Sequence, residues 1–339
     1  MPVPALICIY LVLAGGLVFL SDKLGNYIDL LDKKTSVSGA FLGGVLLAAV
    51  TSLPELFTSI SATLFVQESD LVVGNVLGSN LFNVLVLGLC LVLFFKLFQK
   101  SKVDYKSHFF TLLGLAIIYP IICFGLLVPS QYQPVIGPIN VICPLILVVY
   151  GLIIYFQPKE DDSKEEEAEE KEDNSPLTVK QILFRFIICA VVLVAVSIVI
   201  TYVTDALGDE LGLDATVAGA LFLAVATSLP ELVSCISLCR RGNFNAGIGD
   251  IVGSCFFNFV IIGIAEFLSY KNSLITQGGE DAIAMTLLAM IVLVVLFGLL
   301  LVKKLVIDAK KEKKSVWFNI LTIVVGLIAL SGYIVFLII

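Results

Sequence analysis

The residues with the clearest potential for chemistry are acids that recur inside apolar stretches. Residues 51–56 and 227–232 both read Thr-Ser-Leu-Pro-Glu-Leu, which places Glu55 and Glu231 after a proline, and Asp250 is a third acid in such a stretch. An unpaired acid at bilayer depth costs roughly 2.5–3.5 kcal/mol, so the three represent about 8–10 kcal/mol. Because no Lys or Arg lies within these stretches, we expect a bound cation or protons to neutralise them.

A second motif follows each Pro-Glu copy at similar spacing. Residues 74–83 read Gly-Asn-Val-Leu-Gly-Ser-Asn-Leu-Phe-Asn, and residues 249–258 read Gly-Asp-Ile-Val-Gly-Ser-Cys-Phe-Phe-Asn. The glycines would let helices approach closely. The Asn, Asp and Ser residues of this motif offer oxygens, as do the residues of the Pro-Glu motif. The candidate ligands are therefore all hard: carboxylates, amides, hydroxyls and carbonyls. Such a set suits Ca²⁺, which takes 6–8 oxygens in flexible geometry, better than Mg²⁺, which demands an octahedron and keeps its waters.

The prolines predict how these residues are presented. Pro54 and Pro230 cannot donate a backbone hydrogen bond, so each helix should kink or break there. Proline suits the start of a new half-helix, which puts each glutamate in its first turn. Such a break also frees backbone carbonyls beside the preceding Thr-Ser hydroxyls.

The composition defines the elements that must position these residues. The 339 residues are 59% hydrophobic and only 14% charged, whereas soluble domains carry about 25% charged residues. With a net charge of −7 and no basic stripe, nucleic-acid binding is excluded as a main task. A spanning helix needs about 20 apolar residues, and we predict ten: 3–20, 37–66, 71–95, 108–128, 135–156, 181–204, 214–239, 246–269, 281–302 and 316–338.

The basic residues predict the orientation. With ten spans, 20 of the 21 Lys and Arg residues fall in loops on one side, and only Lys271 falls on the other. The positive-inside rule assigns the crowded side to the cytoplasm, so we expect a plasma- or inner-membrane protein with both termini outside. Residues 157–178 are strongly acidic and should form a solvated cytoplasmic linker. They divide the chain into 1–156 and 179–339.

The halves are predicted to be inverted repeats. Each has five spans, an odd number, so the two enter the membrane in opposite senses. The fold class is therefore an all-α polytopic membrane protein of ten transmembrane helices, arranged as two inverted five-helix repeats with broken helices 2 and 7. Such architecture is typical of secondary transporters with a site near the midplane. Protons or Na⁺ can compete with Ca²⁺ for the same oxygens, which is the minimal mechanism of antiport.

The cysteines and the single histidine are interpreted as structural. All eight cysteines lie inside apolar spans, where a free thiol behaves as a small hydrophobe. His108 lies at a span edge, and for it a functional role and an interfacial position without a role are equal alternatives. With one histidine, we expect no Cys/His metal cluster and no cofactor.

The two repeated motifs resemble those of the calcium/cation antiporter superfamily, which includes the sodium/calcium exchangers and their proton-coupled and potassium-dependent relatives. The resemblance implies that Glu55 and Glu231 are the central calcium ligands. It implies that a further set of residues completes the site: Thr51, Ser52, Thr227, Ser228, Asn75 and Asp250. It also implies that spans one and six slide across a core of the other eight.

Departures from the family pattern bear on the counter-ion. Val50 and Ala226 stand where relatives often have glycine, and Leu71 and Ala246 stand where sodium exchangers often have a hydroxyl. These changes favour protons, or fewer Na⁺ ions per cycle. The coupling ion among Na⁺, H⁺ and K⁺ stays open.

Two alternatives come from other classes. Gly-Ile-Gly-Asp at 247–250 is similar to the motif of intramembrane aspartyl proteases, but such an enzyme needs a second aspartate sharing a proton, and no other lies deep in a span. A cation channel would favour a symmetric ring of ligands. We therefore predict no enzyme, but a Ca²⁺ antiporter that uses Na⁺ or H⁺, has the lipid bilayer as its partner, and functions as a monomer.

Overall fold

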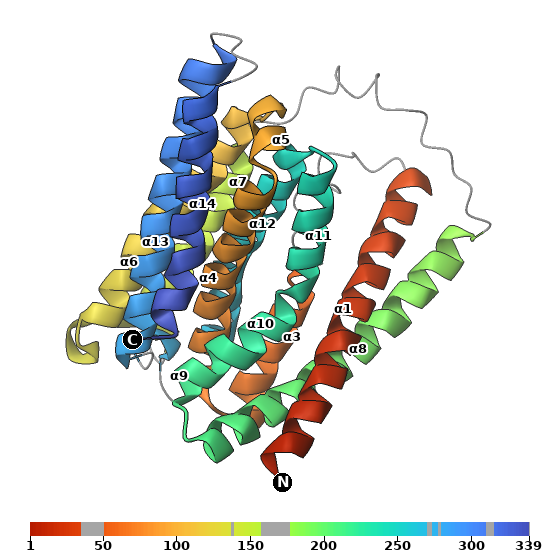
Figure 1. The fold of residues 1–339 in the computed structure, drawn as a ribbon. Helices are drawn as coiled ribbons and strands as arrows, with labels where there is room; N and C mark the ends of the chain where they lie inside the picture. The colour runs from red at the N-terminus through yellow and green to blue at the C-terminus, as the bar shows by residue number, and fades with distance from the viewer. Residues whose placement is uncertain are drawn as a thin grey trace.

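The computed structural model describes residues 1–34, 51–136, 139–156, 177–269, 273–276, 279–309 and 315–338. The helical elements, drawn in Figure 1, are α1 Val3–Lys34, α3 Leu53–Ser61, η2 Ala62–Val66, α4 Ser69–Leu93, α5 Phe95–Lys100, α6 Tyr105–Leu127, η3 Ser130–Tyr132, α7 Ile142–Phe156, α8 Val179–Leu211, α9 Ala215–Ala218, η5 Gly219–Leu223, α10 Ala224–Thr227, α11 Leu229–Arg240, α12 Phe244–Leu268, η6 Leu274–Thr276, α13 Gly279–Val302, η7 Lys303–Asp308 and α14 Val316–Phe336. One antiparallel pair of short strands, β1 Val135–Ile136 and β2 Ile139–Asn140, completes the described elements.

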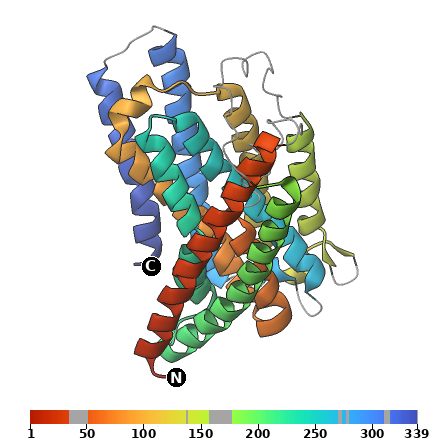
Figure 2. The ribbon, with the colours of Figure 1, turned by 90° about the vertical axis from the view of Figure 1, so that its right-hand side faces the viewer.

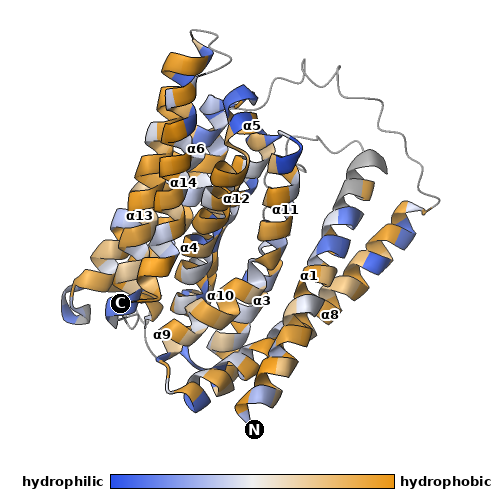
Figure 3. Ribbon diagram, viewed as in Figure 1, coloured by the Kyte–Doolittle hydropathy of each residue, from blue (hydrophilic) through white to orange (hydrophobic). Residues whose placement is uncertain are grey.

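The helices are long and apolar enough to identify a multi-pass membrane protein. Among the described residues, seven helices have the length and composition of a membrane span, and the bent pair Ala215–Thr227 and Leu229–Arg240 forms an eighth candidate. Two shorter apolar helices, Leu53–Val66 and Ile142–Phe156, accompany them. Figure 3 shows hydrophobic residues along the helices and hydrophilic ones gathered towards their ends. The first part of the predicted span 37–66 lies outside the described residues.

The helices that carry the second motif form the centre of the bundle. Within the most apolar 18-residue stretch of each helix, 78% of the α4 residues and 67% of the α12 residues are buried. The corresponding shares are only 22% in α1 and 28% in α8. α4 packs against α12, α14 and the η5–α10 segment, so it contacts mainly the second half of the chain. The two motif-bearing helices are therefore surrounded by protein, as buried polar groups require.

α1 and α8 lie side by side and splay away from the rest of the bundle at one end (Figures 1 and 2). Both are longer than the predicted spans 3–20 and 181–204. α1 continues because Leu17, Leu20 and Leu24 keep a helical spacing that packs against α8 residues such as Leu193 and Ile200. α8 begins at a capping box formed by Thr178 and ends only at Gly212, which adopts a left-handed conformation.

The predicted span 135–156 is shorter in the structure. Val135 pairs with Asn140, and Ile136 pairs with Ile139, so residues up to 140 do not join the helix. The Asn140 side chain accepts a hydrogen bond from the Ile142 amide at 3.0 Å, which fixes the start of α7. The hydropathy pattern missed this boundary because the strand residues are as apolar as those of the helix.

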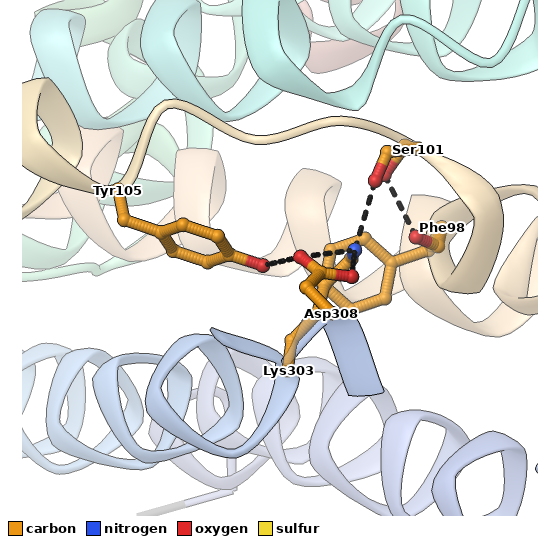
Figure 4. A network of polar contacts seen from close by, with 5 residues as sticks. All are labelled: Phe98, Ser101, Tyr105, Lys303 and Asp308. Atoms are coloured by element: carbon orange, nitrogen blue, oxygen red, sulfur yellow. Dashed lines mark hydrogen bonds and ion pairs between the residues drawn. The ribbon is translucent and has the colours of Figure 1, made fainter. Parts of the chain in front are cut away.

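A buried lysine joins two connections at the other end of the bundle (Figure 4). Lys303 is fully buried, and its Nζ donates to the Ser101 carbonyl at 2.8 Å and to both Asp308 carboxylate oxygens at 3.1 and 3.2 Å. The Tyr105 hydroxyl donates to the same carboxylate. This network fastens η7 to the α5–α6 connection and leaves Lys303 paired.

Candidate cation site

Both Pro-Glu motifs begin a new helix after a break, as the sequence predicts. α10 ends at Thr227 and α11 begins at Leu229 with a bend of 49° between them. α3 begins at Leu53 in the same way, and the residues before the two helices have nearly identical backbones: Ser52 at φ −88°, ψ 11° and Ser228 at φ −90°, ψ 6°. The two copies therefore adopt one local conformation. Proline is tolerated in the first turn because the amides there have no intrahelical acceptor.

The acids lie where the sequence places them. Glu55 and Glu231 occupy the first turns of α3 and α11 and are fully buried, and Asp250 on α12 is 8% exposed. The N-terminus of a helix carries partial positive charge, which favours a carboxylate there. Glu231 interacts electrostatically with both Glu55 and Asp250, so the three acids form one cluster.

Each Thr-Ser pair brings at least one residue close to the glutamate of the other half. The Ser228 hydroxyl donates to Glu55 Oε1 at 3.0 Å. Thr227 lies near Glu55, and Thr51 lies at the corresponding place near Glu231. The site is thus built by exchange of partners between the repeats, and neither half forms it alone.

Asn75 connects the second motif to the first. Its side-chain amide donates to the Glu55 carbonyl at 3.3 Å, to Thr58 Oγ1 at 3.1 Å and to Ser59 Oγ at 2.9 Å. Its Oδ1 accepts from the Thr227 hydroxyl at 3.4 Å. These contacts hold Asn75 among oxygens from both halves and fix which end of the amide is the donor.

The sequence analysis missed the hydroxyls that support these side chains. Asp250 interacts with Ser234, just as Asn75 contacts Thr58. Thr58 and Ser234 both lie three residues after their glutamates, at equivalent repeat positions. Residues three or four apart share a helix face, so the spacing from the glutamate was a usable signal.

A second polar layer lies further along the second motif. Asn258 Nδ2 donates to Asn80 Oδ1 at 2.9 Å, and Cys255 Sγ donates to the Asn80 carbonyl at 3.7 Å. All three side chains are fully buried. This layer joins α4 to α12 further along the second motif and gives Asn80 and Asn258 a structural role.

The site contains oxygens with no donor. Within the site, five buried carboxylate oxygens lack a hydrogen-bond partner among the described residues: Glu55 Oε2 and both oxygens of Glu231 and Asp250. The Ser52 hydroxyl is likewise buried without a partner. Among the described residues, no Lys or Arg forms an ion pair with these acids. The buried Lys303 pairs with Asp308 instead. Buried oxygens without donors are the type of ligand that a hard cation takes.

A cavity lies along α11, the helix whose first turn carries Glu231. It has a volume of about 570 Å³ and runs along α11 from Arg241 and Arg240 past Ile236 to Leu232, the residue after Glu231. The end of α11 that carries Arg240 is on the side of the bundle where α1 and α8 diverge (Figure 1).

At the opposite end, α1 and α8 are packed against the bundle by apolar residues. The packing includes Leu17 and Ile200 with Leu223 and Ala226, the latter two just before the Thr-Ser break. Leu6 and Leu207 form a smaller cluster against Phe222. Apolar contacts of α1 and α8 therefore cover the chain just before the Thr-Ser break at this end.

The cysteines differ from the sequence expectation. Three of them, Cys90, Cys235 and Cys239, bring their sulfur atoms together, with all three within 4.8 Å of one another. Spacing alone did not reveal this cluster because Cys90 lies 145 residues from Cys235.

The fold and the buried acidic site define a class of membrane transporter, and sequence comparison identifies the family. The profile of the sodium/calcium exchanger protein family matches residues 5–159 and 181–339. The chain belongs to this family. Because the family consists of exchangers, the chain is not an enzyme, and the protease interpretation is set aside.

The chain is similar to several known proteins along most of its length. It is 25% identical over 273 residues to the inner membrane protein YrbG of Escherichia coli, covering 79% of each chain. It is 27% identical over 293 residues to the sodium/calcium exchanger MaX1 of Methanosarcina acetivorans, covering 76% of this chain and 82% of that one.

Solved structures share the fold. The H⁺/Ca²⁺ exchanger CAX aligns with a TM-score of 0.63 at 14% identity, over 98% of this chain and 87% of that one. The sodium-calcium exchanger NCX_Mj aligns with a TM-score of 0.57 at 20% identity, over 97% and 98% of the two chains.

Proposed function

We propose that this protein is a secondary antiporter that exchanges Ca²⁺ for Na⁺ or H⁺ by alternating access at the Glu55–Glu231–Asp250 site. The observation that carries the proposal is the set of five buried carboxylate oxygens without donors, contributed by both repeats. Such oxygens are costly unless a cation or protons occupy them. Family membership supports cation exchange, and the hard donor set supports Ca²⁺.

The charge balance supports exchange. Three ionised acids around one Ca²⁺ leave an excess negative charge, so a monovalent cation or a proton must share the cluster. A carrier that releases Ca²⁺ must then neutralise the same oxygens with other cations. Both counter-ions are represented among similar proteins: CAX is described as an H⁺/Ca²⁺ exchanger, and MaX1 as a sodium/calcium exchanger.

The proposed topology has ten spans. The seven long helices, the bent pair, and the two shorter apolar helices together supply this number. Residues 1–156 and 179–339 would form inverted five-span repeats joined by the acidic linker 157–178. Both termini would then lie outside, and the cavity along α11 would open to the cytoplasm because Arg240 and Arg241 flank it.

The proposed motion involves α1 and α8. They are the least buried of the long helices, and each contacts the other more extensively than it contacts any other single element. Sliding of this pair would close the cavity beside α11 and open the opposite side, while α4 and α12 keep the site intact. Since every site residue comes from one chain, the monomer is the proposed functional unit.

The decisive experiment is Ca²⁺ uptake into proteoliposomes under separately imposed Na⁺, K⁺ and H⁺ gradients. We expect uptake to follow the Na⁺ or the H⁺ gradient. Uptake indifferent to all three gradients would reject exchange. Currents with unitary steps in a planar bilayer would instead favour a channel.

The site is tested by Glu55→Gln and Glu231→Gln. Each keeps the shape of the side chain but removes a negative charge from the cation's ligands, so we expect transport to be abolished while the folded chain is retained. The matched control is Glu266→Gln, a buried acid on α12 that accepts hydrogen bonds from the Asn140 and Leu274 amides instead. Its folded fraction should still exchange. Normal flux in either site variant would refute the ligand assignment.

A further inference from the structure

Three cysteines form a sulfur cluster outside the cation site. Cys90 lies near the end of α4, and Cys235 and Cys239 lie one turn apart on α11. The sulfur atoms of Cys90 and Cys235 are 3.7 Å apart, and those of Cys235 and Cys239 are 3.9 Å apart. All three residues are fully buried. The side chains thus point towards a common centre from two different helices.

The third wall of this cluster is a glycine. A Cβ built on Gly247 of α12 would lie 2.8 Å from Cys239 Sγ, so only glycine lets α12 pack here with the thiols in place. The Gly247 carbonyl is also 3.8 Å from Cys235 Sγ, where it accepts the thiol proton. The surroundings therefore supply three neighbouring sulfurs, with one carbonyl oxygen beside Cys235.

We propose that Cys90, Cys235 and Cys239 bind a single thiophilic cation of the class that includes Cu⁺, Zn²⁺ and Cd²⁺, at a site separate from the transported Ca²⁺. Thiolate sulfur is a soft ligand that selects such ions, whereas Ca²⁺ takes oxygen ligands. A divalent ion would displace two thiol protons, leaving two thiolates and one thiol. That complex is neutral, which suits a buried site of low polarity.

The cluster lies close to the polar end of α11. Cys239 directly precedes Arg240, the last residue of the helix, so an ion has a short path from the α11–α12 turn. Glu231, Cys235 and Cys239 are spaced by four residues and share one face of α11. The cluster begins about 6 Å along the axis from Glu231, given a rise of 1.5 Å per residue.

Occupancy should also affect exchange. A bound ion would link α4 to α11 one turn from a proposed ligand of Ca²⁺. We expect a thiophilic ion to slow Ca²⁺ exchange, and a thiol-containing chelator to restore it.

The test uses the reduced, purified full-length chain and Cd²⁺, whose thiolate complexes absorb in the ultraviolet. We expect one Cd²⁺ per chain with a charge-transfer band that persists in a large excess of Ca²⁺, since Ca²⁺ clears the oxygen site alone. Cys235→Ala should bind Cd²⁺ at least about 10-fold more weakly and lose the band, because losing even an outer-shell partner costs 10–100-fold. The matched control is Cys143→Ala, which removes a fully buried thiol on α7.

Three outcomes would overturn the proposal. The first is the absence of a band in the parent chain, and the second is displacement of all bound Cd²⁺ by Ca²⁺. The third is an unchanged band in Cys235→Ala. If Cys235→Ala does not fold, Cys239→Ala is read by the same criteria, because its position at the helix end tolerates a smaller side chain more readily.

Discussion

The glycines of the two repeats make a paired prediction, because equivalent positions are packed differently. Gly74 precedes Asn75, and Gly249 precedes Asp250. A Cβ on Gly74 would lie 2.1 Å from the Thr216 carbonyl oxygen, whereas the nearest atom to a Cβ on Gly249 is His108 Cε1 at 3.5 Å. The first distance is an impossible overlap with backbone, and the second is an ordinary contact. Gly74→Ala and Gly249→Ala therefore form a matched pair.

The magnitude follows from these contacts. Each substitution gains about 0.8–1.0 kcal/mol of helix propensity, so this contribution cancels between the two variants. Overpacking in a well-packed interior costs typically 1–3 kcal/mol, occasionally more. Because Thr216 contributes backbone, which cannot rotate away, Gly74→Ala should be less stable than Gly249→Ala by at least about 1–3 kcal/mol. At about 2–4 °C per kcal/mol, the unfolding midpoints should differ by several degrees.

The assays are thermal unfolding of the purified chains and Ca²⁺ flux in proteoliposomes. Gly249→Ala should unfold at or above the parental temperature. Gly74→Ala should unfold earlier and lose flux, because displacing α4 moves Asn75 away from Thr58, Ser59 and the Glu55 carbonyl. Equal midpoints for the two variants would refute the packing assigned to α4 and α9.

Three further predictions concern individual contacts and pH. Ser228→Ala removes a hydrogen bond to the Glu55 carboxylate; bonds to charged groups contribute about 1.5–3 kcal/mol, so Ca²⁺ affinity measured by titration should fall by roughly 10-fold or more, and an unchanged affinity would contradict this geometry. Lys303→Met leaves the Ser101 carbonyl without its donor and Asp308 without its charged partner, with only the Tyr105 hydroxyl still donating to that carboxylate, so stability should fall by about 1–3 kcal/mol in thermal unfolding, with exchange by the folded fraction retained. Ligand carboxylates must be deprotonated, so Ca²⁺ affinity should decrease as pH falls, and affinity independent of pH between 5 and 8 would exclude protons as competitors.

The local features of the site were predictable from sequence. The breaks before Leu53 and Leu229 follow from proline, which acts on its own turn whatever surrounds it. The burial of Glu55 and Glu231 follows from the apolar stretches around them, because the bilayer imposes a length and polarity that hydropathy reports directly. The internal repeat identified the residues that belong together.

Other features depended on distant parts of the chain. The continuation of α1 past residue 20 is stabilised by Leu24, which packs in the cluster shared with α8, and the late start of α7 is set by the Asn140 side chain. Neither is visible in local hydropathy. The roles of Thr58 and Ser234 required the neighbouring helix, although their spacing from the glutamates offered a signal.

The sequence by itself determined that this is a multi-span helical protein with repeated, broken helices carrying buried acids, because span length, helix breaking and the cost of an intramembrane charge are local properties. Only the tertiary structure decided which oxygens lack donors, how Ser228 of one half meets Glu55 of the other, and that three cysteines on α4 and α11 converge. Those features arise from packing between segments more than a hundred residues apart, and no local pattern specifies the distances across such an interface.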